Sequence, residues 1–124
     1  MYTVKIRNHV MIAHSLRGEV FGPAQNMHGA TYIVDAVFYS NSLDSNNIVI
    51  DIGIAHRALK DVLAPLNYKN LDEVPDFVDQ VTTTEYLAKY IHDKMKEKTS
   101  CIFSGRIQIT LGESHVAWAS YTGE

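Results

Sequence analysis

The chain has 124 residues, of which 46% are hydrophobic and 20% are charged, and its formal net charge is −3. This length and balance predict one globular domain over residues 1–124 and exclude a disordered chain. Without a basic excess, nucleic acid is not expected as the main partner. The single cysteine excludes an internal disulfide, and no apolar run is long enough to span a bilayer. We therefore expect a cytoplasmic protein with no membrane partner.

Two alternating segments flank a loop in the first third of the chain. Residues 1–16 place apolar side chains on one face that ends in His14, and residues 27–40 have a face that begins with His28. Glycine and proline interrupt residues 17–26. The period of two predicts a pair of strands, and their loop ends could bring the two imidazoles together.

Helical spacing follows in the middle of the chain. Apolar residues over 53–63 predict an amphipathic helix, with Asp51 as its N-cap. The stretch Thr82-Thr83-Thr84-Glu85 matches a capping box, with Glu85 as the reciprocal partner, and predicts a second helix that runs to about residue 98. The connection over residues 66–77 is expected to be a loop.

Two further alternating segments, residues 103–113 and 115–121, predict a second pair of strands. The order β-β-α-α-β-β predicts an α+β domain, with a four-stranded antiparallel sheet and two helices on one face. Its outer strands would leave long unpaired edges, which favours assembly through those edges.

The two histidines are the first candidates for a functional site. A lone inward histidine is more often a hydrogen-bonded core residue than a ligand, but a pair that flanks one loop is a stronger signal. A catalytic zinc ion takes three protein ligands, and the next position on the face of His28 is Ala30, which cannot ligate. We expect no cofactor; zinc would need a third donor from His115 or from another subunit.

Glu113 is the second candidate. It shares parity with three apolar residues of its strand, so the pattern places its carboxylate on the apolar face, where an unpaired charge is costly. A ligand with two adjacent N–H donors would satisfy it. A buried ion pair, or a strand end already in water, would do so equally well.

Six short motifs, in order along the chain, resemble those of the 6-pyruvoyl-tetrahydropterin synthase / 6-carboxytetrahydropterin synthase family. They are Ile12-Ala13-His14, His28-Gly29-Ala30-Thr31-Tyr32, Val49-Ile50-Asp51-Ile52, Leu66-Asn67-Tyr68-Lys69-Asn70-Leu71-Asp72, Thr82-Thr83-Thr84-Glu85 and Gly112-Glu113-Ser114. The resemblance implies the tunnelling fold, in which trimers close into a barrel of strands. It also implies a homohexamer built as a dimer of trimers, with sites at subunit interfaces.

The chain differs from this family at the positions of its zinc-binding and catalytic residues. Family members with synthase activity have a third zinc-ligating histidine where this chain has Ala30. They have a catalytic cysteine four residues before the first histidine of their H-G-H motif, the position of Ala24 here. Their Asp-His pair corresponds to Asn67 and Tyr68. Because the zinc ligands and the proton relay are both incomplete, the usual synthase reaction is not expected.

The substrate anchor of the family is retained. In the family, a glutamate at the position of Glu113 accepts two N–H bonds from the 2-amino-pyrimidinone edge of a pterin, and the region of Thr83 and Thr84 frames the ring. A charge-assisted bidentate pair of this kind is a strong polar contact. The resemblance therefore implies a pterin-like small molecule as the partner.

Three functions remain open from the sequence. The first is an enzyme with altered pterin chemistry, in which His14, His28, Tyr68 and His115 are the candidates for proton transfer without zinc. The second is a non-catalytic protein that binds a pterin or a purine-like molecule. The third is a lyase acting on dihydroneopterin triphosphate with replacement metal ligands, which is disfavoured because Arg17 is the only cation near the loop.

Overall fold

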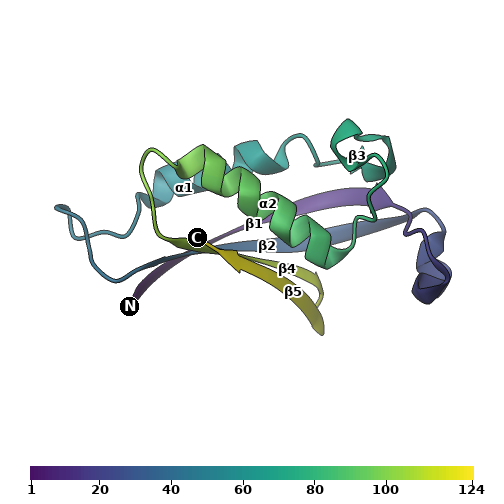
Figure 1. Cartoon of the computed structure of the whole chain (residues 1–124), viewed down its shortest axis with the longest axis horizontal. Coiled ribbons are helices and arrows are strands. Elements are labelled where there is room, and N and C mark those ends of the chain that lie inside the picture. The colour runs from purple at the N-terminus through teal and green to yellow at the C-terminus, as the bar shows by residue number, and fades with distance from the viewer.

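A computed structural model describes all residues, 1–124, as one sheet covered on one face by two helices (Figure 1). The four long strands are β1 (Tyr2–His14), β2 (His28–Ser40), β4 (Arg106–Ser114) and β5 (Ala117–Gly123). They pair antiparallel in the order β1-β2-β4-β5. The helices α1 (Ile52–Leu63) and α2 (Thr84–Thr99) lie between the two strand pairs in the sequence. The predicted α+β class and element order are confirmed.

The sheet has a fifth strand, so the prediction of four strands was incomplete. β3 (Lys69–Asn70) pairs parallel with residues 12–13 of β1, within the segment expected to be a loop. Short 3-10 turns follow at Leu71–Glu73 and Pro75–Phe77, and another, Glu19–Gln25, occupies the loop between β1 and β2. A two-residue strand has no periodicity to detect in the sequence.

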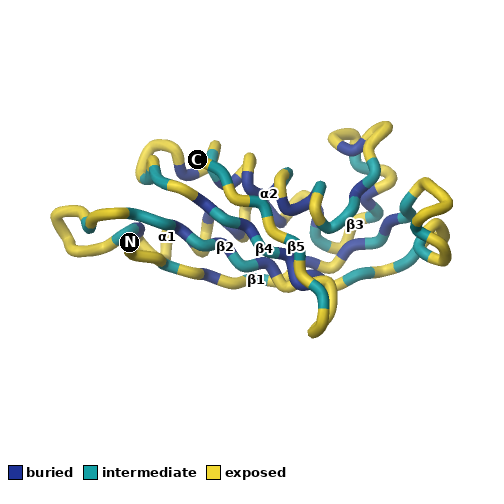
Figure 2. The backbone as a smooth tube through the Cα atoms, turned by 60° about the horizontal axis from the view of Figure 1, so that its bottom comes forward, coloured by how far each residue is buried: buried dark blue, intermediate teal, exposed yellow.

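The core lies between the sheet and the helices. Every second residue is buried over residues 10–14 of β1 and 32–38 of β2, and the alternation of buried and exposed segments is visible along the chain in Figure 2. The helices contribute their apolar faces, including Leu59 of α1 and Met95 of α2, neither of which is exposed to solvent. The burial of these side chains is the main force that holds the helices on the sheet.

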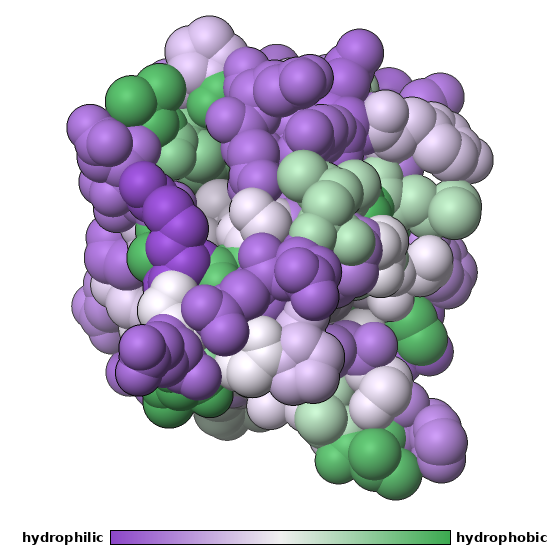
Figure 3. Space-filling model, turned by 90° about the vertical axis from the view of Figure 1, so that its right-hand side faces the viewer, coloured by the Kyte–Doolittle hydropathy of each residue, from purple (hydrophilic) through white to green (hydrophobic).

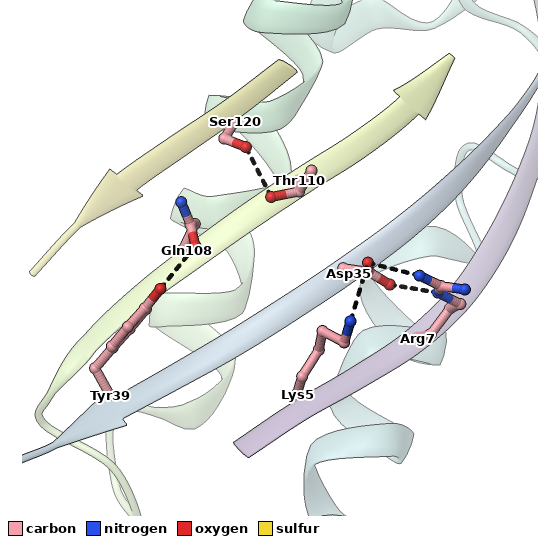
Figure 4. A network of polar contacts seen from close by, with 7 residues as sticks. All are labelled: Lys5, Arg7, Asp35, Tyr39, Gln108, Thr110 and Ser120. Carbon is pink, nitrogen blue, oxygen red and sulfur yellow. Dashed lines mark hydrogen bonds and ion pairs between the residues drawn. The ribbon is translucent and has the colours of Figure 1, made fainter. Parts of the chain in front are cut away.

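The opposite face of the sheet combines a network of polar side chains with exposed hydrophobic residues, among them Met11, Ile33 and Trp118. Arg7 of β1 donates two hydrogen bonds to the Asp35 carboxylate of β2, at 2.7 and 3.0 Å, and Lys5 lies 3.9 Å from the same carboxylate (Figure 4). Two further cross-strand bonds continue this network, Tyr39–Gln108 and Thr110–Ser120. Because no helix covers this face, its polar groups are paired laterally across the strands.

The two long helices begin at side-chain caps. Asp51 accepts a hydrogen bond from the Ile54 amide at 3.0 Å, which confirms the N-cap predicted for α1. In α2 the N-cap is Thr83, whose hydroxyl accepts from the Tyr86 amide at 3.1 Å. The prediction of a capping box was therefore wrong. The N-cap is one residue later than predicted, and Glu85 does not bond back to it.

Both edges of the sheet remain partly open in the single chain. The outer side of β1 pairs with β3 only at residues 12–13, and β5 has a strand neighbour on one side only. Neither α1 nor α2 has the length and apolar composition that a membrane crossing requires.

Candidate functional site

The two histidines meet at one end of the sheet. The register of β1 and β2 places His14 directly opposite His28, and their rings lie edge to face with centroids 4.6 Å apart. His14 is only 2% exposed, whereas His28 is partly exposed. The prediction that the loop brings the two imidazoles together is confirmed.

Each ring is held through its Nδ1 atom. His28 Nδ1 lies 2.8 Å from the main-chain carbonyl oxygen of Asn26, which can only accept a hydrogen bond. His28 therefore carries its hydrogen on Nδ1, and in the neutral ring Nε2 is free to accept. His14 Nδ1 lies 3.0 Å from the buried hydroxyl of Thr82.

The surroundings of His14 favour the neutral ring. Burial lowers its pKa, and the neighbouring His28 acts in the same direction. Asp72 and a hydrogen bond to the Thr82 main chain partly oppose this shift in the pKa. Asp72 is itself held by the loop that follows β1, because it accepts hydrogen bonds from the hydroxyl and the main-chain amide of Ser15. His14 is thus neutral near pH 7.

The donor set does not fit a catalytic zinc ion within one chain. Ala30 pairs with Ile12, two positions along the strand from the histidine pair, and offers only a methyl group. No group of three histidine, cysteine, aspartate or glutamate side chains gathers anywhere in the chain. His115 lies in the exposed turn between β4 and β5. Two imidazoles are one ligand fewer than such a site requires.

Asn67 and Tyr68 both form hydrogen bonds with the main chain of Met11 in β1. The Asn67 side-chain oxygen accepts a hydrogen bond from the Met11 amide at 3.0 Å, and the Tyr68 amide donates to the Met11 carbonyl at 2.6 Å. Tyr68 has a positive φ of 60° and its side chain is 77% exposed. The Asn67 side chain is thus engaged with the β1 edge, and the Tyr68 ring extends into solvent.

Glu113 is exposed to solvent in the single chain. A bulge between Gly112 and Ser114 interrupts the pairing with β5, and Glu113, the residue within the bulge, is exposed. The expected burial of this carboxylate was therefore wrong for the single chain. A bulge shifts all following side chains to the other face, and alternation alone cannot reveal it.

Glu113 nevertheless lies close to the start of α2. Burial raises the pKa of the Tyr32 hydroxyl, while hydrogen bonding to Thr84 lowers it. The carboxylates of Glu113 and Glu85 raise this pKa further, which requires both to be near the phenol. Glu113 therefore lies within electrostatic range of the Tyr32 phenol, and Thr84 lies beside that phenol in the first turn of α2. Sequence reasoning missed Tyr32, which follows the His28-Gly29-Ala30-Thr31 motif directly but reads as an ordinary core residue.

A polar cavity of about 260 Å³ is lined by Thr82, the contact of His14, but by neither histidine. Its walls include Ser15, Arg17, Asp72 and Thr82. The Arg17 guanidinium donates to the main-chain carbonyl of Gln80 at 3.0 Å and is thus already engaged. Figure 3 shows the end of the molecule on the right of Figure 1, where hydrophilic surface predominates and hydrophobic residues form separate patches.

A family model and the curated relatives all indicate the same protein family. The family model described as "6-pyruvoyl tetrahydropterin synthase" matches residues 3–124. A 6-pyruvoyl tetrahydrobiopterin synthase of Poecilia reticulata is 32% identical over 121 residues, which cover 90% of this chain and 81% of the relative. The human protein of the same name is 31% identical over 83 residues, 64% of this chain and 57% of its own length.

Solved structures agree on the fold. The 6-pyruvoyl tetrahydropterin synthase of Caenorhabditis elegans has a TM-score of 0.86 at 23% identity, over 99% of this chain and 96% of its own. The Plasmodium falciparum protein of the same name has a TM-score of 0.78 at 17% identity, over 98% and 97% of the two chains.

Proposed function

This chain belongs to the 6-pyruvoyl tetrahydropterin synthase family, and on that premise we propose that it binds a pterin-like molecule at Glu113 without performing the zinc-dependent synthase reaction. Within this proposal Glu113 is the anchor, and Thr83 and Thr84 frame the bound ring. The site performs altered pterin chemistry in which His14 and His28 exchange protons with the ligand.

The observation that supports the proposal is that Glu113 and Thr84, the latter at the start of α2, both influence the pKa of the buried Tyr32 phenol of β2. A carboxylate can accept two parallel N–H bonds from a 2-amino-pyrimidinone edge. The first turn of a helix also offers main-chain amides that are not used within the helix. These groups together match the donors and acceptors along one edge of a pterin.

The second support is the state of the two imidazoles. His14 and His28 are in contact, and the Asn26 carbonyl keeps the His28 hydrogen on Nδ1, so that Nε2 of the neutral ring is the acceptor. A neutral imidazole accepts a proton at neutral pH and can return it, which is what general base and acid catalysis requires. Tyr68 and His115 are exposed in the single chain, so they take part only if a neighbouring subunit brings them to the ligand.

We also propose that the protein is a homohexamer, assembled as two trimers with sites at the subunit interfaces. The open edges of β1 and β5 support this, because unpaired strand edges favour pairing with another chain. Sedimentation velocity measures the mass directly, and a monomer at micromolar concentration would refute the assembly. A cytoplasmic location remains a prediction from the single cysteine.

The triphosphate lyase has less support than the other two functions. Triphosphate recognition requires several cations, and Arg17 already donates to the Gln80 carbonyl. A non-catalytic protein that binds a pterin or a purine-like molecule uses the same anchor and differs only in the absence of turnover. The assay for turnover incubates the protein with a dihydropterin and follows the products by chromatography, with a His14→Gln variant alongside.

The binding experiment is a fluorescence titration of a pterin into wild-type protein and Glu113→Gln. Glutamine keeps the shape of the side chain but lacks the charge and offers one acceptor oxygen, so loss of affinity by about tenfold or more is expected. Glu97→Gln is the control, because Glu97 is an exposed glutamate in the last turns of α2. Equal affinities in wild type and Glu113→Gln would refute the anchor. Absence of binding in the wild type would refute the pterin.

A further inference from the structure

The polar cavity of about 260 Å³ lies between the loop that follows β1 and the segment that leads into α2. Ser15 and Arg17 line it from the first side, and residues between 71 and 82 line it from the second. Two hydrogen bonds join these walls. The Ser15 hydroxyl donates to the Asp72 carboxylate at 2.5 Å, and the Arg17 guanidinium donates to the Gln80 main-chain carbonyl at 3.0 Å. Neither histidine of the candidate site lines the cavity, so it is a separate feature of the molecule.

Arg17 brings a positive charge to this cavity that no carboxylate neutralises. Its bond to the Gln80 carbonyl uses one N–H group of a guanidinium that carries several more in a planar fork. Arg17 takes part in none of the ion pairs of the chain, although Asp72 and Asp79 line the same cavity. The Gln80 carbonyl therefore holds the guanidinium at the cavity wall, and its remaining N–H groups suit a carboxylate.

Asp79 brings a negative charge that is equally unpaired. Its carboxylate takes part in none of the ion pairs of the chain. The other aspartate of the cavity, Asp72, already accepts hydrogen bonds from the hydroxyl and the main-chain amide of Ser15. One cation and one carboxylate, Arg17 and Asp79, thus line a single cavity without pairing with each other. Such an arrangement is complementary to a ligand that carries both signs of charge.

The lining also has an apolar part. Leu71 and Phe77 line the cavity and are buried in the core of the chain, and the exposed Val78 lies between Phe77 and Asp79. Pockets that bind small molecules combine apolar walls with a few placed polar groups, and their volumes begin at about 300 Å³. A cavity of about 260 Å³ therefore suits a ligand smaller than a typical cofactor or drug.

We propose that this cavity binds a small zwitterion, an α-amino acid with an apolar side chain. The carboxylate of the amino acid binds Arg17, its ammonium group binds Asp79, and its side chain lies against Leu71 and Phe77. A simple anion would leave Asp79 unpaired, and a simple cation would do the same to Arg17. One free cation is too few for a triphosphate but matches a single carboxylate. This site goes beyond the proposed pterin site and does not depend on it.

The test is equilibrium dialysis of radiolabelled L-leucine against the full chain at neutral pH, without any pterin. Two unlabelled competitors each lack one charge of leucine. Isocaproate has no ammonium group, and isoamylamine has no carboxylate. We expect unlabelled leucine to displace the label, and each competitor to be weaker by about tenfold or more, because it loses one charge-assisted contact.

Two variants locate the binding. Arg17→Gln removes the cation, and Asp79→Asn removes the carboxylate charge at a residue whose φ is 60°, a conformation that asparagine tolerates. Each variant should weaken leucine binding by about tenfold or more. Arg57→Gln and Asp61→Asn are the matched controls, because both residues are exposed in α1 and do not line the cavity. Both controls should bind leucine as the wild type does.

Three results would overturn the proposal. The first is a wild-type protein that retains no leucine at millimolar concentrations. The second is an isocaproate that competes as well as leucine, which would reduce the cavity to a simple anion site. The third is undiminished binding in Arg17→Gln or Asp79→Asn. The first two need no variant, so they decide the matter even where a substitution impairs folding. Leucine binding in a protein that binds no pterin keeps this inference and refutes the proposed function, and pterin binding without leucine binding does the reverse.

Discussion

The side chain of Asn67 is bonded to the edge of β1, where its oxygen accepts a hydrogen bond from the Met11 amide at 3.0 Å. The Met11 carbonyl in turn accepts from the Tyr68 amide. The residue that stands where related synthases carry the aspartate of their Asp-His pair therefore supports the backbone of β1, two residues before β3 begins pairing with that strand.

Asn67→Ala should lower the free energy of unfolding by about 1 kcal/mol, because the Met11 amide loses its acceptor. Asn67→Asp retains an acceptor oxygen and should be close to the wild type in stability. Thermal unfolding of the two variants measures the difference. Equal stability of Asn67→Ala and wild-type protein would mean that water replaces the side chain at no cost.

Loss of the N-cap of α2 gives a second prediction. Thr83→Ala should destabilise the protein by about 1 kcal/mol, and Thr83→Ser should be almost neutral, because serine caps as well as threonine. Glu85→Gln should leave the stability nearly unchanged, since Glu85 does not close a capping box. A larger effect for Glu85→Gln than for Thr83→Ala in chemical denaturation would contradict the assigned cap.

The ion pair on the polar face of the sheet predicts the behaviour in acid. The Arg7 hydrogen bond holds the pKa of the Asp35 carboxyl below its usual range, against the opposing effect of burial. The unfolded chain binds a proton at Asp35 near pH 4, and the folded protein does so only at lower pH. The pair therefore stabilises the fold above about pH 4, and this contribution is lost as the pH falls through the lower pKa of the folded state.

Asp35→Asn should remove that part of the acid dependence. Melting temperatures between about pH 6 and pH 2 measure this acid dependence. The difference in melting temperature between wild type and variant should narrow as the pH falls below about 4. Asp61→Asn is the control, because Asp61 is exposed and lies 3.8 Å from the exposed Lys98. A gap of constant size at all pH values would show that Asp35 acts through packing and not through its charge.

The incomplete donor set predicts the response to zinc. Ala30→His would place a third imidazole on the strand face of His28 and should raise the affinity for zinc strongly, because three ligands satisfy the usual requirement of a catalytic site. Ala13→His is the control, since Ala13 is the neighbour of His14 in β1 and faces the other side of the sheet. Metal analysis after dialysis against a chelator should find zinc only in Ala30→His. Tight zinc in the wild type would require a third donor from a neighbouring subunit.

Periodicity predicted most of the fold because the strands and helices are long. The alternation of β1 and β2 located both histidines at facing positions, since antiparallel strands joined by one loop must oppose their ends. What alternation could not predict were local irregularities. Glu113 lies within a bulge and is exposed, and β3 is too short to have a period.

The sequence indicated only some residues of the candidate site. His14, His28 and Glu113 carry chemical groups that stand out in a sequence, whereas Thr82 lies in a run of three threonines that fits more than one capping register. Its contact with His14 joins segments 68 residues apart, and only the three-dimensional structure shows such a contact. Tyr32 was missed because a tyrosine on an apolar face is most often a core residue.

The most direct test of the central claim is calorimetric titration of a pterin into chelator-treated wild-type protein whose metal content has been measured. The account predicts binding with the same affinity before and after removal of metal, because Glu113 and the first turn of α2 hold the ligand. Binding that disappears on chelation and returns with zinc would contradict it, and would place a metal ion at the centre of this site.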